Sequence, residues 1–132
     1  MRLDELKRYA NLGDRAEDIK EQIARVEAAL TLGATDPGSP SGKGGHNDRI
    51  AQGIARLEEL RARLMEEEAQ AGEKRRNMER WLRSLRPHEE RVMRMRYIKG
   101  CKWGQIDKAL HYSRGSAYKI QERMQKNGKV ER

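Results

Sequence analysis

The chain has 132 residues, no Phe, 5% aromatic and 38% charged residues, a composition too polar for a thick globular core and suited to long, solvated helices. Its formal net charge is +8, and its single Cys and lack of an apolar run of about 20 residues exclude an intramolecular disulfide and a transmembrane helix. We therefore expect a cytoplasmic protein with no membrane partner.

An amphipathic helix is predicted from about residue 2 to residue 32. Its apolar residues recur every three or four positions, which is the heptad pattern of a coiled-coil helix. Gly13 lies inside this segment and weakens a helix by about 1 kcal/mol relative to Ala, whereas Gly33 is a suitable C-terminal stop. The apolar stripe consists of Tyr9, Leu12, Ala16, Ile19, Ile23, Val26 and Leu30.

The following segment, residues 33–47, is predicted to be a flexible loop, because Gly, Pro and Ser make up nine of its 15 residues. It contains GKGG at residues 42–45. A phosphate-binding loop requires a Lys followed by Ser or Thr at the start of a helix, and this spacing is missing. We therefore interpret the segment as a linker.

A second helix is predicted from about residue 48 to residue 85, although Arg61, Glu68 and Arg75 interrupt its apolar stripe. Two helices that each carry one apolar stripe can pair antiparallel within one chain. The stripes of two chains can also pair as a homodimer, and the sequence is compatible with both arrangements. The stripe consists of Ile50, Ile54, Leu57, Leu64, Ala71, Met78, Leu82 and Leu85.

From Leu85 onward the apolar pattern changes to that of three short helices. Pro87 suits the first turn of the first helix, and Gly100 suits its end. Ser113 is expected to cap the third helix. The apolar faces consist of Val92, Met95 and Ile98, then of Trp103, Ile106, Ala109 and Leu110, and finally of Ala117, Ile120 and Met124.

The second and third of these helices, joined by about three residues at 111–113, are typical of a helix-turn-helix. Such a motif presents the N-terminal half of its last helix to the major groove of DNA. Outward side chains there would contact base edges or phosphates, with Arg123, one turn further on, at a phosphate. The predicted DNA-binding residues are Arg114, Gly115, Ser116, Tyr118, Lys119 and Arg123.

The charge distribution agrees with this placement. Residues 1–72 hold 11 Lys and Arg against 14 Asp and Glu, whereas residues 73–132 hold 18 against 7. Lys and Arg release the counterions that condense on phosphate, so the basic C-terminal part has the charge expected of a nucleic-acid-binding protein.

Residues 85–124, LRPHEERVMRMRYIKGCKWGQIDKALHYSRGSAYKIQERM, resemble the fourth region of bacterial sigma factors. They resemble more closely the C-terminal module of the ArpU/RinA-like late-gene activators of phages and prophages. The resemblance implies that the outward residues of the last helix form the DNA-reading surface. Gly104 stands where the family has an acidic residue, and Gly115 where it has a polar one. The residues that carry the resemblance are Leu85, Pro87, Glu89, Val92, Arg96, Tyr97, Ile98, Gly100, Trp103, Ile106, Leu110, Tyr112, Ser113, Arg114 and Tyr118.

No motif in the chain requires catalysis. His88, Glu89 and Glu90 lie at a predicted helix start, where acidic side chains complement the helix dipole, and no nucleophile stands at a matching position. The three His and one Cys match no zinc-binding spacing. We therefore expect neither an enzyme nor a cofactor or metal.

The sequence thus predicts an all-α protein of two domains. Residues 1–84 form a long, coiled-coil-like helical hairpin with the loop at 33–47, and residues 85–132 form a sigma-region-4-like helix-turn-helix DNA-binding domain. The expected function is sequence-specific regulation of phage or prophage transcription, with activation of late genes and double-stranded DNA as the partner. One alternative is a small-terminase-like subunit that recognises DNA for packaging. The other is an interaction protein that binds RNA polymerase or another regulator.

Overall fold

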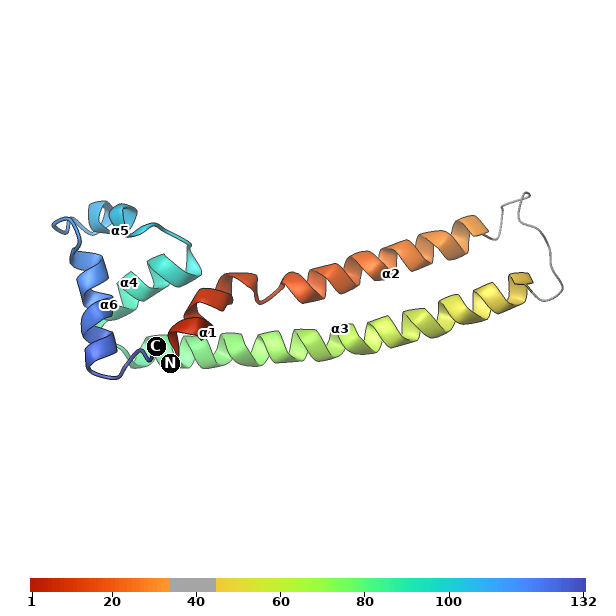
Figure 1. Cartoon of the computed structure of the whole chain (residues 1–132), viewed down its shortest axis with the longest axis horizontal. Helices are drawn as coiled ribbons and strands as arrows, with labels where there is room; N and C mark the ends of the chain where they lie inside the picture. Colours follow the sequence, from red (N-terminus) through yellow and green to blue (C-terminus); the bar gives the residue numbers. More distant parts are fainter. Residues whose placement is uncertain (34–44) are drawn as a thin grey trace. The chain divides into compact units, whose positions relative to one another are not determined.

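The computed structural model describes residues 1–33 and 45–132 and is all-α there, as predicted (Figure 1). These residues form two compact units: residues 1–12 with 72–132, here named the basic unit, and residues 13–71, named the hairpin unit. No described helix is both long enough and apolar enough to cross a bilayer. The elements in chain order are α1 (Leu3–Arg8), the 3-10 helix η1 (Tyr9–Asn11), α2 (Asp14–Gly33), α3 (Gly45–Ser84), α4 (Pro87–Met93), the π-helical η2 (Arg94–Ile98), α5 (Trp103–Ala109) and α6 (Ser116–Lys126).

The hairpin unit consists of α2 and the first part of α3, which run antiparallel (Figure 1). Arg61 donates a hydrogen bond to Glu27 at 3.1 Å, and Lys20 lies 3.8 Å from Glu68. Two of the polar residues that interrupt the predicted stripe therefore pair with the opposite helix, although exposed ion pairs contribute little stability. The buried apolar residues of this unit are Ala16, Ile19, Leu57, Leu60 and Ala71.

Near the C-terminal end of α2, this helix approaches α3 closely at a glycine. A Cβ atom on Gly53 would lie 2.5 Å from Cδ2 of Leu30, so the side chain of Leu30 would have to shift if residue 53 carried a Cβ atom. Most of the predicted linker, residues 34–44, lies outside the described residues. Its two ends are helical, since Gly33 ends α2 and α3 begins at Gly45.

The prediction of one continuous helix over residues 2–32 was wrong. α1 ends at Arg8, η1 follows, and α2 begins only at Asp14, after a turn at residues 12–13. Gly13 occupies the break, as its low helix propensity allows. The apolar periodicity does not reveal this break, because apolar residues keep their three- and four-residue spacing across the turn.

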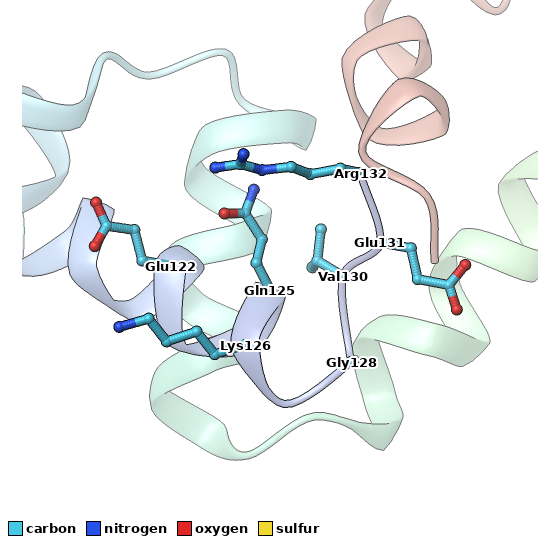
Figure 2. A pocket seen from close by; sticks show the side chains of 7 residues that line it. All are labelled: Glu122, Gln125, Lys126, Gly128, Val130, Glu131 and Arg132. Carbon is cyan, nitrogen blue, oxygen red and sulfur yellow. The ribbon is translucent and has the colours of Figure 1, made fainter.

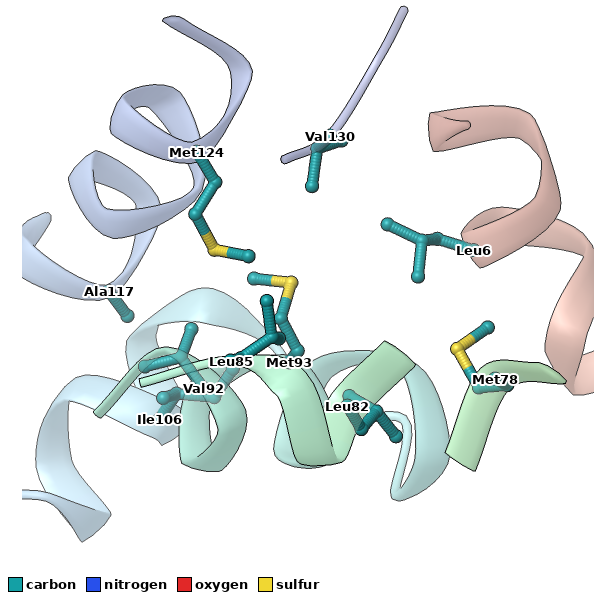
Figure 3. Close-up of a cluster of buried hydrophobic side chains, with 10 residues drawn as sticks. All are labelled: Leu6, Met78, Leu82, Leu85, Val92, Met93, Ile106, Ala117, Met124 and Val130. Atoms are coloured by element: carbon teal, nitrogen blue, oxygen red, sulfur yellow. The ribbon is translucent and has the colours of Figure 1, made fainter. Parts of the chain in front are cut away.

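The basic unit contains a cluster of buried apolar side chains (Figure 3). Leu6 of α1 belongs to this cluster and is only 1% exposed. The compact units divide at residues 12/13 and 71/72, so the predicted domain boundary at residue 84 does not coincide with them. Both ends of the predicted hairpin domain belong to the same unit as residues 85–132. The cluster consists of Leu6, Met78, Leu82, Leu85, Val92, Met93, Ile106, Ala117, Met124 and Val130.

The two ends of the chain pair with each other in the basic unit. The backbone N–H of Leu3 donates to the carbonyl of Glu131 at 2.6 Å, and the N–H of Glu131 donates to the carbonyl of Met1 at 2.8 Å. Val130, between these contacts, is 1% exposed. The N-terminal segment is therefore an integral part of the basic unit.

A charge cluster connects the end of α3 to α4 and η2. Arg94 donates to both carboxylate oxygens of Glu79, at 2.6 and 3.0 Å, and to Glu90 at 2.9 Å. The hydrogen bonds from Arg94 hold the pKa of Glu79 below its usual value, and the two carboxylates raise the pKa of the Arg94 guanidinium. A bidentate pair of this kind fixes orientation as well as contributing energy.

Glu89 is a buried acid in α4, with its side chain 7% exposed. Its carboxylate accepts hydrogen bonds from Nζ of Lys129 at 2.7 Å and from the backbone N–H of Arg86 at 3.0 Å. Burial opposes ionisation of Glu89, but these two hydrogen bonds outweigh it and hold its pKa below the usual value. Glu89 thus caps α4 and ties the C-terminal segment to it.

Substitution Leu6→Ala is expected to destabilise the basic unit by about 2–5 kcal/mol, because it leaves a cavity in the buried cluster. Urea unfolding followed by circular dichroism measures this change. The matched control is Met65→Ala, at a residue that is 73% exposed, which should change stability by no more than about 0.5 kcal/mol. Equal effects of the two substitutions would contradict the placement of Leu6 in the core.

Glu89→Gln is expected to make stability less dependent on pH in the acid range. Because folding lowers the pKa of Glu89, its contribution is fully present above the unfolded value of about 4.3 and is lost as pH falls through the folded value. The stability difference between wild type and variant, measured from about pH 6 down to about pH 3, should therefore shrink toward acid. Lys129→Met should shift the acid loss of stability to higher pH, and a pH-independent difference for both variants would refute the assignment.

Candidate nucleic-acid interface

α5 and α6 form the predicted helix-turn-helix pair, but the connection is longer than predicted and runs from Leu110 to Gly115. α5 ends in a Schellman motif, in which Tyr112 N–H donates to the carbonyl of Asp107 at 2.7 Å and His111 N–H donates to that of Lys108 at 3.3 Å. His111 adopts the left-handed conformation with φ 58°. The turn is therefore defined by backbone hydrogen bonds on its α5 side.

The start of α6 is capped by Asp107, and the prediction that Ser113 caps it was wrong. The carboxylate of Asp107, a buried residue of α5, accepts hydrogen bonds from the N–H groups of Gly115 and Ala117, both at 2.9 Å. Gly115 has φ +84°, which strains any residue with a Cβ. Gly115 is thus required by the backbone geometry of the turn.

The inward face of α6 is as predicted. Ala117 and Met124 are fully buried, and Ile120 packs at the edge of the same cluster. Gln121, also buried, accepts a hydrogen bond from the hydroxyl of Tyr97 in η2, and burial raises the pKa of that tyrosine. Apolar packing and this polar contact together determine which side of α6 faces solvent.

An aromatic contact lies on one side of α6. Tyr118, which is 42% exposed, packs edge-on against Trp103 of α5, with ring centroids 5.4 Å apart and an interplanar angle of 82°. The guanidinium of Arg96 lies 4.7 Å from the centroid of the Trp103 ring and donates to the carbonyl of Cys101. Trp103 is therefore half-buried at the edge of the core, and it restricts the ring of Tyr118.

Of the predicted DNA-binding residues, Arg114, Tyr118, Lys119 and Arg123 are exposed, whereas Gly115 and Ser116 are half-buried. Arg114 lies in the turn before α6. Among residues 1–33 and 45–132, the side chains of Arg114, Lys119 and Arg123 form no ion pair. Their charges therefore face solvent without neutralisation.

The structure brings three of the predicted residues together in one groove. The groove has a volume of about 300 Å³ and contains no acidic residue in its lining. It includes His88 of α4, which the sequence predicts only as a residue at a helix start. The lining residues are His88, Tyr112, Ser116, Lys119, Ile120 and Arg123.

The charge separates more sharply by unit than by sequence half. The basic unit holds 21 Lys and Arg against 9 Asp and Glu, which gives +12, and the hairpin unit holds 8 against 12, which gives −4. Four of the nine acids in the basic unit form the internal contacts described above: Glu79, Glu89, Glu90 and Asp107. The cations around α6 therefore have few competing carboxylates.

A second hollow, of about 470 Å³, lies beside the C-terminal segment (Figure 2). Two carboxylates and two cations line it, so its charge does not select for anions. Within the described residues, no three His, Cys, Asp or Glu side chains are grouped so that they could hold a metal ion. The lining residues are Glu122, Gln125, Lys126, Gly128, Val130, Glu131 and Arg132.

Comparisons of the chain with known protein families, with curated proteins and with solved structures found no match. A function for the chain is therefore inferred from its own residues and their geometry.

Asp107→Ala is expected to destabilise the basic unit by about 1–3 kcal/mol, because one buried and one half-buried N–H group lose their acceptor. Asp107→Asn keeps one acceptor oxygen and should lie between the wild type and the Ala variant. Urea unfolding of the three proteins tests this order. If Ala and Asn variants are as stable as wild type, Asp107 is not the cap of α6.

Proposed function

We propose that the basic unit binds double-stranded DNA through α6 and the preceding turn, and that the protein is a sequence-specific transcriptional regulator. The observation that carries this proposal is the pairing of a buried face with an unneutralised cationic face on one short helix. Ala117 and Met124 are 0% exposed, whereas Lys119 and Arg123 are exposed and form no ion pair among the described residues. An α-helix of this kind fits the major groove of B-DNA.

The residues nearest the start of α6 are the best candidates for reading bases. Arg114 precedes the helix and carries a planar guanidinium, which can bond guanine O6 and N7 together. Tyr118 follows one turn later, and its packing on Trp103 limits the entropy lost when it contacts a base or phosphate. Gly115 adds no side chain between them, so the backbone can approach the duplex closely.

The resemblance of residues 85–124 to the ArpU/RinA-like activators and to the fourth region of sigma factors supports the more specific proposal. This more specific proposal is that the chain regulates the transcription of phage or prophage genes, and activates late genes, in the cytoplasm of the bacterial host.

A packaging role is a second candidate, favoured by apolar residues exposed on the hairpin unit. Ile54 is 49% exposed and Met65 is 73% exposed, and a spacing of eleven residues places them on the same face of α3. A small-terminase-like protein would use such a face to assemble a ring of many subunits. Mass measurement in solution separates this candidate from a regulator, which would be a monomer or a dimer.

Arg114→Ala is expected to weaken binding to the preferred DNA site by about 1–3 kcal/mol and to relax the preference at one base pair. The site is first obtained by selecting bound sequences from random duplex DNA, and binding is then measured by fluorescence anisotropy. The matched control is Arg75→Ala, at an exposed arginine of α3, which should leave the sequence preference unchanged.

Two outcomes count against these assignments. Equal weakening of all sequences by Arg114→Ala would make Arg114 a phosphate contact. Absence of salt-dependent binding of the wild-type protein to any duplex would refute DNA binding itself.

A further inference from the structure

The groove between the start of α4 and α6 differs in chemistry from the rest of the α6 surface. Ser116, Lys119 and Arg123 lie on successive turns of one face of α6, at spacings of three and four residues. His88 of α4 lies opposite them, and Tyr112 and Ile120 complete the lining. Tyr118, and Arg114 in the turn before α6, lie outside the groove.

Nearby carboxylates do not neutralise the groove. Glu89 follows His88 directly in the chain, but its carboxylate is bonded to Lys129 and to the backbone of Arg86. Glu90 is bonded to Arg94. The hollow beside the C-terminal segment (Figure 2) has carboxylates in its lining, and the groove has none. The groove therefore favours an anion.

The donors that an anion would meet in this groove belong to side chains. At the start of α6, the N–H groups of Gly115 and Ala117 are bonded to Asp107, and that of Ser116 is bonded to the carbonyl of Ser113. The remaining donors are the ammonium of Lys119, the guanidinium of Arg123, the hydroxyl groups of Ser116 and Tyr112, and the imidazole of His88. Two positive charges with further donors beside them suit a phosphate oxygen pair.

We infer that this groove binds a phosphate of the DNA backbone, and that Lys119 and Arg123 contribute affinity without sequence preference. The inference rests on the proposed function and divides its surface: Arg114 and Tyr118 read bases, and the groove fixes the position of α6 on the strand. His88 enters the interface as a contact from outside the helix-turn-helix pair, so it positions α4 as well as α6 on the duplex.

The dependence of binding on salt tests the inference. The double variant Lys119→Gln/Arg123→Gln should reduce the slope of log K against log salt by at least about one, because phosphate contacts release counterions. It should weaken the selected site and an unrelated duplex of equal length by the same factor. Lys126→Gln is the matched control, because Lys126 lies on the same helix but lines the other hollow, and it should leave the slope unchanged.

Neutral phosphates locate the contact on the DNA. In a set of duplexes that each carry one methylphosphonate, one or two positions should weaken wild-type binding about tenfold, which corresponds to the loss of a charged contact. The same positions should have no further effect on the double variant, because the interacting charges are already absent. His88→Gln should weaken binding to the unmodified duplex, and it should have a smaller effect on duplexes that carry the neutral phosphate at these positions. Thermal unfolding of each variant confirms that it is folded.

The outcomes distinguish the two proposals. If wild-type protein binds DNA but the double variant keeps its salt slope, the groove is not a phosphate site and the DNA-binding proposal stands. A changed base preference in the double variant also overturns the inference, because it makes Lys119 or Arg123 a base-reading residue. If wild-type protein binds no duplex at all, both proposals are wrong.

Discussion

The buried carboxylate of Asp107 is the interaction on which the candidate interface depends. It accepts two N–H groups at the start of α6, and it belongs to α5, so it joins the two helices at a fixed point. The positive φ of Gly115 makes this contact sterically possible. Apolar packing of Ala117 and Met124 then determines the rotation of α6 about its axis. The exposed cations are positioned by these buried contacts.

The sequence predicts the helices well and their connections poorly. Apolar residues that recur at every third or fourth position locate α3, α5 and α6, because helical periodicity is a local property of the sequence. The break at Gly13 and the membership of Leu6 in the basic unit depend on contacts with residues far along the chain, which periodicity does not contain. The candidate site divides in the same way: Arg114 and Lys119 are predicted from helical faces, whereas His88 joins the groove only through the packing of α4.

Four of the nine acids of the basic unit accept hydrogen bonds inside it, whereas the cations of the candidate interface stay exposed. Glu79, Glu89 and Asp107 each accept hydrogen bonds that hold one element to another. Lys119 and Arg123 form no such contact in the part of the chain that the structure describes. An anionic polymer therefore meets exposed cations, while three nearby carboxylates are bonded within the unit. The net charge of +12 therefore attracts an anion more strongly at this surface than it would if acidic and basic residues alternated there.

The division of the chain makes the hairpin unit an insertion within the basic unit, since residues 13–71 separate Leu6 from the rest of its cluster. Closing a flexible loop of that length costs roughly 3–4 kcal/mol of entropy. Antiparallel pairing of α2 with α3 brings the two ends of the insertion together, and so reduces this cost. The length of the hairpin is then free to vary in whole turns without disturbing the basic unit. A change in the length of the insertion therefore leaves the buried cluster and the exposed cations of the basic unit unchanged.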